Sequence, residues 1–302
     1  MLSTVFMGTP EVAVPALRLL AARTRVRAVV TQPDRPAGRG NQLTPPAVKL
    51  AALELGLPVW QPESLKGQAG DVRFEDLDLA VVMAYGELLR QDVLDRPRHG
   101  CINLHASLLP RWRGASPMQA VIRAGEASTG VCVMRMVRGL DAGPVYLREE
   151  VPLNASATLP WLHDRLAQAA ADALGHFLDA WPQVTATPQD DSAATHCRKL
   201  TAEDGQLDFT RTAAELDRWV RAYTPAPGCW VPMDGGRLRI LALQPWPASL
   251  PMGDMVAVDG RILVGCADGA VVITRLQSPG KKPLDAAAWL NGNKLPPRAA
   301  EG

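Results

Sequence analysis

The chain has 302 residues, of which 47% are hydrophobic and 21% are charged, and its 32 Lys and Arg residues are matched by 31 Asp and Glu residues. Single cores rarely grow past about 250 residues, so we expect two domains. The net charge of +1 excludes a uniformly basic protein, and any nucleic acid must therefore be held by local patches.

The five cysteines stand singly, without the close pairs that are typical of zinc sites or of disulfide-rich secreted domains. The apolar start of the chain is interrupted by Gly8-Thr9-Pro10, and no apolar run approaches the roughly 20 residues of a membrane span. We therefore expect a cytoplasmic monomer that needs no metal and makes no membrane contact.

Short β-branched runs alternate with helical patterns over the first 150 residues, which is typical of a parallel sheet covered by helices. Thr9 and Pro10 suit the cap and first turn of a helix that ends near Ala22. Prolines and glycines in residues 32–40 predict a long exposed loop before a helix at 47–55. The predicted strands are 4–7, 26–31, 79–84, 101–105, 129–136 and 145–151.

An Ala-rich amphipathic helix at 159–180 is stopped by Trp181-Pro182, so the first domain is predicted to span residues 1–182. Residues 183–202 have little periodicity and read as a linker. Residues 203–302 are predicted to form a small β-barrel or sandwich after a helix at 212–223. Its strands are 256–258, 261–264 and 270–276, joined by Asp-Gly turn signals. The predicted fold class is α/β, a Rossmann-like sheet followed by a small β domain.

Asn103 and His105 stand two residues apart in the predicted strand 101–105, so both side chains project to one face near its carboxyl end. Open α/β sheets bind ligands at that end. An amide beside an imidazole offers hydrogen-bond donors to an oxygen that gains negative charge, as acyl transfer requires. The spacing alone favours a pair that merely caps the strand end.

Two further segments favour a chemical role for Asn103 and His105 over a role in capping the strand. Ser107-Leu108-Leu109-Pro110 follows the strand, and its apolar groups suit a flat ring. Asp141 stands between Gly139 and Gly143, which let the chain turn tightly. Asp141 is suited to orient His105 or to accept a proton, and it is equally suited to form a turn without any chemical role.

Read together, the segments Asn103 to Pro110 and Gly139 to Gly143 resemble the formyltransferase superfamily that uses 10-formyltetrahydrofolate. The run from Thr31 to Gly40 and Arg111-Trp112-Arg113-Gly114-Ala115 are similar to the branch that formylates methionyl-tRNA. Residues 276–282 and 289–292 resemble the carboxyl-terminal domain of that branch, so the resemblance covers nearly the whole chain.

The resemblance implies a Rossmann-like formyltransferase domain and an OB-like, tRNA-binding barrel. The implied reaction passes the formyl group of 10-formyltetrahydrofolate to the α-amino group of methionyl initiator tRNA. The implied catalytic residues are Asn103, His105 and Asp141. The implied folate site consists of Ser107, Leu108, Leu109 and Pro110. Ala142 and Pro144 stand where the family often has threonine and aspartate.

Arg35 and Arg39 lie in the predicted loop and suit contacts with the tRNA acceptor stem, although such residues are otherwise solvated loop charges. Residues 203–302 carry 11 acidic and 11 basic side chains. Any RNA contact by this part of the chain therefore requires a patch such as Lys281-Lys282.

Other functions fit parts of this pattern. The same chemistry serves formylation of an amino sugar nucleotide or of glycinamide ribonucleotide. A non-catalytic RNA-binding module is a third alternative, and hydrolysis of the formyl folate to formate is a fourth. The joint presence of Asn103, His105 and Asp141 argues against the non-catalytic module.

Overall fold

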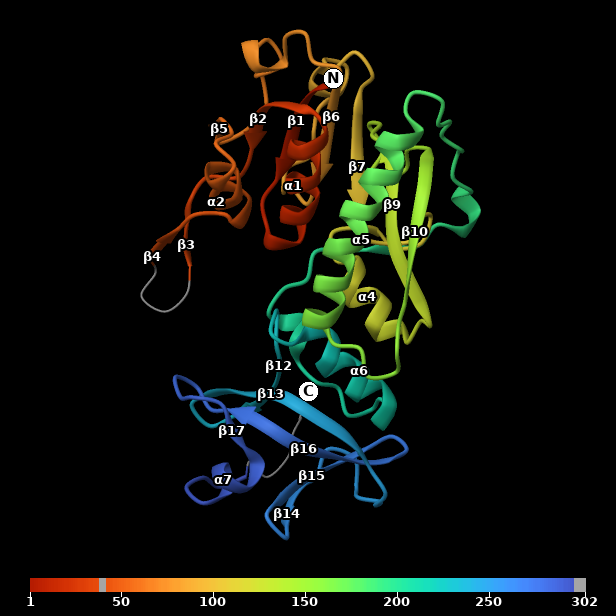
Figure 1. Ribbon diagram of the computed structural model, residues 1–302. Helices are drawn as coiled ribbons and strands as arrows, with labels where there is room; N and C mark the ends of the chain where they lie inside the picture. The colour runs from red at the N-terminus through yellow and green to blue at the C-terminus, as the bar shows by residue number, and fades with distance from the viewer. Residues whose placement is uncertain (38–41, 296–302) are drawn as a thin grey trace. The chain divides into compact units, whose positions relative to one another are not determined.

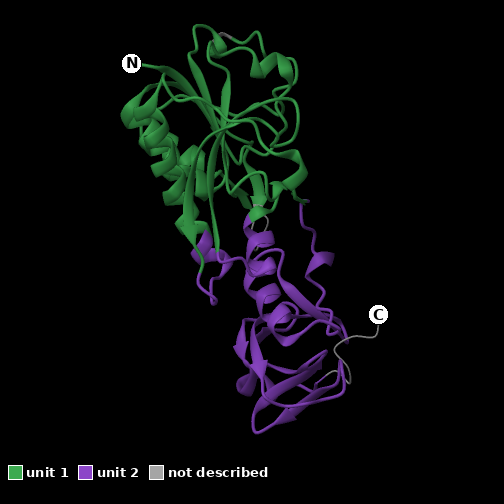
Figure 2. Ribbon diagram, turned by 90° about the vertical axis from the view of Figure 1, so that its right-hand side faces the viewer, with its two compact units in different colours: residues 1–117, 128–153, 163–197 green, residues 118–127, 154–162, 198–302 purple. Residues whose placement is uncertain are grey.

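The computed structural model describes residues 1–37 and 42–295 (Figure 1). The chain divides into two compact units, residues 1–117, 128–153 and 163–197 in the first and residues 118–127, 154–162 and 198–302 in the second (Figure 2). Within the described residues, no helix is long and apolar enough to cross a membrane.

The first unit is built on a seven-stranded sheet with the order β10-β9-β7-β6-β1-β2-β5. Its strands are β1 (Ser3–Gly8), β2 (Arg25–Val30), β5 (Val59–Trp60), β6 (Leu79–Met83), β7 (Cys101–His105), β9 (Ser128–Arg135) and β10 (Val145–Pro152). Five neighbouring strands run parallel to one another, namely β5, β2, β1, β6 and β7. β9 is antiparallel to both of its neighbours, β7 and β10. β6 is buried along its whole length, which explains its continuous apolar sequence.

Helices cover this sheet. They are α1 (Val14–Arg23), α2 (Ala47–Glu54), α3 (Gln91–Leu94) and residues 163–180 of α5 (Leu159–Ala180). Along α5, Leu166, Ala170 and Leu174 are fully buried at a spacing of four residues, so one helical stripe packs inward. Phe177 of the same helix packs edge-on against Tyr146 of β10, with 5.1 Å between ring centroids.

Two predictions for this unit are wrong. Thr9 does not cap a helix, because Pro10 occupies the N-cap of the 3-10 helix Glu11–Ala13 and the Thr9 hydroxyl donates to the carbonyl of Tyr85 at 2.7 Å. The segment 32–40 is not irregular throughout, because β3 (Arg35–Ala37) pairs antiparallel with β4 (Gln42–Thr44). Pro36 of β3 lacks a backbone N–H donor, and a strand of a two-stranded sheet tolerates this loss because one of its edges is unpaired.

The second unit contains an antiparallel sheet of six strands in the order β12-β13-β16-β15-β14, with β17 paired to β16. The strands are β12 (Cys229–Met233), β13 (Gly236–Trp246), β14 (Met255–Val258), β15 (Arg261–Cys266), β16 (Gly269–Gln277) and β17 (Leu284–Asp285). The predicted α/β class, with a Rossmann-like sheet and a separate β domain, is therefore confirmed. The sequence prediction missed β12 and β13.

Local sequence explains how several elements of the second unit begin and end. Its helices are residues 118–124 of α4 (Pro117–Ala124), α6 (Ala213–Tyr223) and α7 (Ala286–Leu290). Thr212 and Glu215 form a reciprocal capping box at the start of α6. Asp259 and Gly260 both have positive φ, 50° and 72°, which suits the tight turn between β14 and β15.

Candidate active site

β7 carries two of the predicted site residues, between β6 and β9 (Figure 1). Asn103 and His105 project to the same side of the strand, roughly 6.6 Å apart along it. The His105 side chain is buried, whereas Asn103 is partly exposed. Among the residues that the structure describes, none makes a hydrogen bond with the Asn103 side chain, so its amide is free to donate to a ligand.

His105 lies between two oxygen atoms. Its Nε2 is 3.1 Å from the carbonyl oxygen of Trp112, and its Nδ1 is 3.6 Å from Oδ2 of Asp141. A carbonyl oxygen can only accept, so Nε2 carries the hydrogen of that bond. The imidazole ring is therefore held between the Trp112 carbonyl and the Asp141 carboxylate.

Asp141 is held mainly by the main chain of another segment. Its Oδ2 accepts a hydrogen bond of 2.8 Å from the backbone N–H of Gly114. Its φ is 48°, in the left-handed region that aspartate tolerates better than most residues. Because the carboxylate is supported by Gly114, Ala142 and Pro144 leave this support intact although they differ from the usual family residues.

The predicted folate segment is half buried. The Ser107 hydroxyl donates to the carbonyl of Arg111 at 2.6 Å and thereby closes the turn after β7. Leu109 is buried in an apolar cluster with Cys132, Met134 and Val145. Leu108 and Pro110 are partly exposed. Leu108 and Pro110 are therefore the members of this segment that present surface to a ligand.

A segment that the sequence prediction missed returns to this site. β8 (Arg113–Gly114) pairs parallel with β11 (His196–Cys197), and the Thr195 hydroxyl accepts from the backbone of Trp112 at 2.9 Å. Gln189 contacts both Arg113 and the turn that contains Asp141. The run from Arg111 to Gly114 pointed to the family but not to this contact, and no local pattern marked residues 189–197.

β8 and β11 approach each other closely at Gly114. Its φ is 118°, and a Cβ at this position would lie 2.1 Å from the carbonyl oxygen of Cys197. No side chain larger than hydrogen fits without moving the backbone. The glycine therefore allows the strand contact and the Asp141 hydrogen bond at the same time.

The thiols of the two cysteines near the site are less acidic than that of a free cysteine. Burial raises the pKa of the Cys132 thiol to about 11, and its sulfur accepts from the backbone N–H of Leu109 at 3.3 Å. The pKa of Cys197 is also raised, by burial and by the negative charge of Asp141. Within the described residues, no three His, Cys, Asp or Glu side chains are placed to hold a metal ion. The chemistry at hand is that of an amide, an imidazole and a carboxylate.

The predicted tRNA-contacting residues lie in separate parts of the chain. Arg35 is exposed and donates to the side chain of Gln32 at 3.1 Å, whereas Arg39 lies outside the described residues. At the base of this hairpin, Asp34 pairs with Lys49 at 2.7 Å. Lys281 and Lys282 are exposed in the turn after β16 of the second unit.

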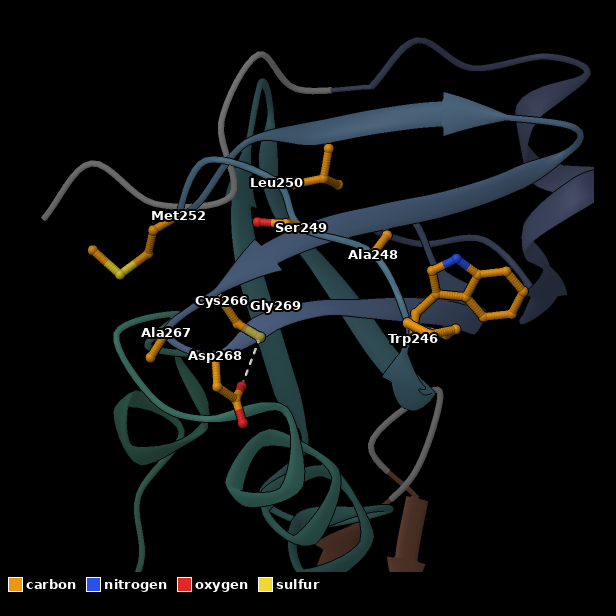
Figure 3. Close-up of a pocket in the computed structure, with 10 residues that line it drawn as sticks. Trp246, Ala248, Ser249, Leu250, Met252, Cys266, Ala267, Asp268 and Gly269 are labelled. Carbon is orange, nitrogen blue, oxygen red and sulfur yellow. Dashed lines mark hydrogen bonds between the residues drawn. The ribbon is translucent and has the colours of Figure 1, made fainter.

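The second unit also contains a pocket of about 720 Å³, lined by residues 246–250, 252 and 266–269 (Figure 3). The one carboxylate among these lining residues belongs to Asp268. It accepts a hydrogen bond of 2.7 Å from the backbone N–H of Ala213 and one of 3.5 Å from the Cys266 thiol. That carboxylate is engaged in holding the start of α6. None of the predicted catalytic residues lines the pocket.

A Rossmann-like sheet with an amide, an imidazole and a carboxylate at its β7 end is compatible with formyl transfer, and comparison with known proteins defines the class. The Formyl transferase family matches residues 6–178, and the family described as Formyl transferase, C-terminal domain matches residues 199–294. The chain belongs to the formyl transferase family.

Relatives of high similarity share one name. The chain is 44% identical over 295 residues to the methionyl-tRNA formyltransferase of Ruegeria pomeroyi, with 97% of each chain covered. It is 47% identical over 301 residues to the methionyl-tRNA formyltransferase of Granulibacter bethesdensis, with 98% of this chain and 95% of the relative covered.

Solved structures confirm the fold at much lower identity. The N-formyltransferase of Helicobacter canadensis, solved with folinic acid and dTDP-3-aminofucose, matches 90% of this chain and 99% of its own with a TM-score of 0.68 and 14% identity. HypX of Aquifex aeolicus matches 97% of this chain and 48% of its own with a TM-score of 0.66 and 17% identity.

Proposed function

We propose that the protein transfers the formyl group of 10-formyltetrahydrofolate to the α-amino group of methionyl initiator tRNA. The proposal rests on one observation above all. Asn103 and His105 at the end of β7, with Asp141 beside His105, occur in a chain that is 44–47% identical, over nearly its whole length, to proteins named methionyl-tRNA formyltransferase.

The demanding step in this reaction is stabilisation of charge. An α-amino group titrates near 7.7–8.0 in peptides and an aminoacyl ester lowers that value, so neutral amine is available at pH 7. Attack on the formyl carbon places negative charge on its oxygen. We assign the Asn103 amide as the donor to this oxygen, a contribution of typically a hundredfold or more in rate. We assign the neighbouring His105 ring as the second group that stabilises this oxygen.

Asp141 has two roles in this proposal. Its carboxylate keeps His105 oriented, and it takes the proton that the amine loses, directly or through a water molecule. When the bond between the formyl carbon and N10 of the folate breaks, this proton passes to N10 and tetrahydrofolate leaves. We assign Leu108 and Pro110 as the apolar contacts for the folate ring, because they retain exposed surface. Ser107 and Leu109 act from within the turn by holding those two residues in place.

For the tRNA, we assign phosphate contacts to Arg35 and Arg39 in the first unit and to Lys281 and Lys282 in the second. Each such contact releases counterions, so replacing both lysines with glutamine lowers the salt dependence of tRNA binding. We further propose that the protein works in the cytoplasm as a monomer. Light scattering measures its oligomeric state directly.

An amino sugar nucleotide is the rival acceptor, and it is favoured by a shared fold with structures that are 13–19% identical. The test offers 10-formyltetrahydrofolate with methionyl initiator tRNA, uncharged tRNA or an amino sugar nucleotide. Formylation of methionyl-tRNA alone supports the proposal. Formylation of the sugar alone, or release of formate without an acceptor, overturns it.

A further inference from the structure

The side chain of Gln189 connects the Asp141 turn to β8. Its Oε1 accepts two hydrogen bonds from the guanidinium of Arg113, at 3.1 Å from Nε and 2.8 Å from Nη2. Its Nε2 donates to the carbonyl oxygens of Asp141 at 2.8 Å and Gly143 at 2.7 Å. The amide therefore uses its full hydrogen-bonding capacity.

Chemistry dictates which way this amide faces. A guanidinium can only donate, so the oxygen of Gln189 must face Arg113 and the NH₂ group must face the two carbonyls. Arg113 is itself only 6% exposed, and Asp191 takes a further hydrogen bond from its Nη2 at 2.7 Å. Leaving a buried guanidinium unpaired is costly, which locks the amide in this orientation.

These contacts close into a ring. The Asp141 carboxylate accepts from the backbone of Gly114, the residue that follows Arg113, while the Asp141 carbonyl accepts from Gln189, which is bound to the Arg113 side chain. Asp141 is thus held at its side chain by Gly114 and at its main chain by Gln189, which is itself bound by the adjacent Arg113. Such a closed ring restrains the distance between the carboxylate and His105.

We propose that Gln189 is a positioning residue for Asp141 in the reaction, with Arg113 fixing the direction of its amide. This inference rests on the proposed function and names a further residue of the same site. Gln189 acts only through Asp141, and it touches neither substrate nor His105. A rival explanation is that Gln189 merely stabilises the fold of the first unit.

The test uses Gln189→Glu, which keeps the shape and the Arg113 partner but replaces two donors with an acceptor that repels both carbonyls. We expect kcat for formyl transfer to fall about ten- to hundredfold, as for small misplacements of a catalytic group, with KM for both substrates changed less than about twofold. The matched control is Gln168→Glu on the exposed face of α5, where the Gln168 side chain donates to Asp172 at 2.9 Å. This control should keep wild-type kinetics.

A double variant separates positioning from folding. If Gln189 acts through Asp141, the variant Asp141→Asn with Gln189→Glu has nearly the kcat of Asp141→Asn alone. Multiplication of the two losses in the double variant overturns the proposal. So does a uniform loss of melting temperature and of both kinetic constants in Gln189→Glu.

A readout without turnover keeps this test independent of the proposed function. The ¹⁵N signals of the His105 ring should move in Gln189→Glu and stay unchanged in Gln168→Glu, because only the first change releases Asp141. Unchanged ring signals in both variants contradict the positioning role even if the enzyme is active. Inactivity of the wild-type protein toward methionyl-tRNA, with shifted ring signals, contradicts only the proposed function.

Discussion

Oδ2 of Asp141 lies 3.6 Å from Nδ1 of His105, too far for a strong hydrogen bond but within reach of an ion pair. Each partner is held separately by the same short segment. Gly114 donates to Asp141, and the carbonyl of Trp112 faces the other nitrogen of His105. Residues 112–114 therefore set the geometry of the pair.

Asp141→Asn tests the charge. Asparagine keeps an oxygen that can accept from Gly114, so the fold of the turn survives while the negative charge is lost. We expect kcat to fall about a hundredfold or more, as for loss of an acid–base group, with folate affinity changed less than about twofold. His105→Ala should give a loss of similar size. Near-wild-type turnover in both variants, measured under saturating substrates, contradicts the assigned roles.

Asn103→Asp tests the oxyanion donor. A carboxylate has the shape of the amide but cannot donate and repels an oxygen that gains negative charge, so we expect kcat to fall about 10²–10³-fold. Asn154→Asp is the matched control. Asn154 accepts from the backbone and hydroxyl of Ser156 at 3.0 Å, and an aspartate retains both bonds. Equal steady-state kinetics of the two variants refutes the role of Asn103.

Gly114→Ala tests the contact between β8 and β11. The added Cβ clashes with the Cys197 carbonyl oxygen, and the alanine has to adopt a positive φ. We therefore expect the free energy of unfolding to fall by about 2–5 kcal/mol. Gly67→Ala separates the two causes, because Gly67 has φ of 77° but no atom within 4 Å of the new Cβ. Calorimetry should show the larger loss of melting temperature for Gly114→Ala, and equal losses would mean that the contact is unimportant.

Asp204 gives the second unit a pH-dependent source of stability. Hydrogen bonds from the Arg198 guanidinium and the Thr201 backbone hold the pKa of this carboxyl well below its usual range. Because the folded pKa is lowered, the stabilisation is present above the unfolded pKa of about 3.9 and is lost as pH falls through the folded value.

Asp204→Asn should therefore lower the melting temperature at pH 7 by a few degrees, and its difference from wild type should shrink below about pH 4. The exposed turn residue Asp259 provides a control, since asparagine also tolerates its φ of 50°. Thermal scans from pH 7 to pH 2 measure both variants. A difference that stays constant over this range contradicts the assignment.

The sequence predicted those features that depend on local pattern. β7 has the predicted bounds of Cys101–His105, and the period of two places Asn103 and His105 on one face. The long helix α5 also has its predicted bounds, since Trp181-Pro182 cannot continue its stripe of buried residues.

Tertiary contacts could not be predicted in this way. Gln189 is 48 residues from Asp141 and 76 from Arg113, in a polar stretch with prolines that has the pattern of a linker. Its role depends on hydrogen bonds to two backbone carbonyls. Every residue type has a backbone carbonyl, so the sequence does not reveal these bonds. Similarly, the glycines around Asp141 predict a turn but do not show that Gly114 holds the carboxylate.

The most direct measurement places methionyl initiator tRNA and an amino sugar nucleotide in one reaction with labelled 10-formyltetrahydrofolate, and follows the label in each acceptor and in formate. Our account predicts that label passes to the methionyl amino group, and that Asn103→Asp and Asp141→Asn each slow this transfer at least about a hundredfold. Transfer of label to the sugar would contradict the account. So would release of label as formate at the same rate by the wild type, Asn103→Asp and Asp141→Asn.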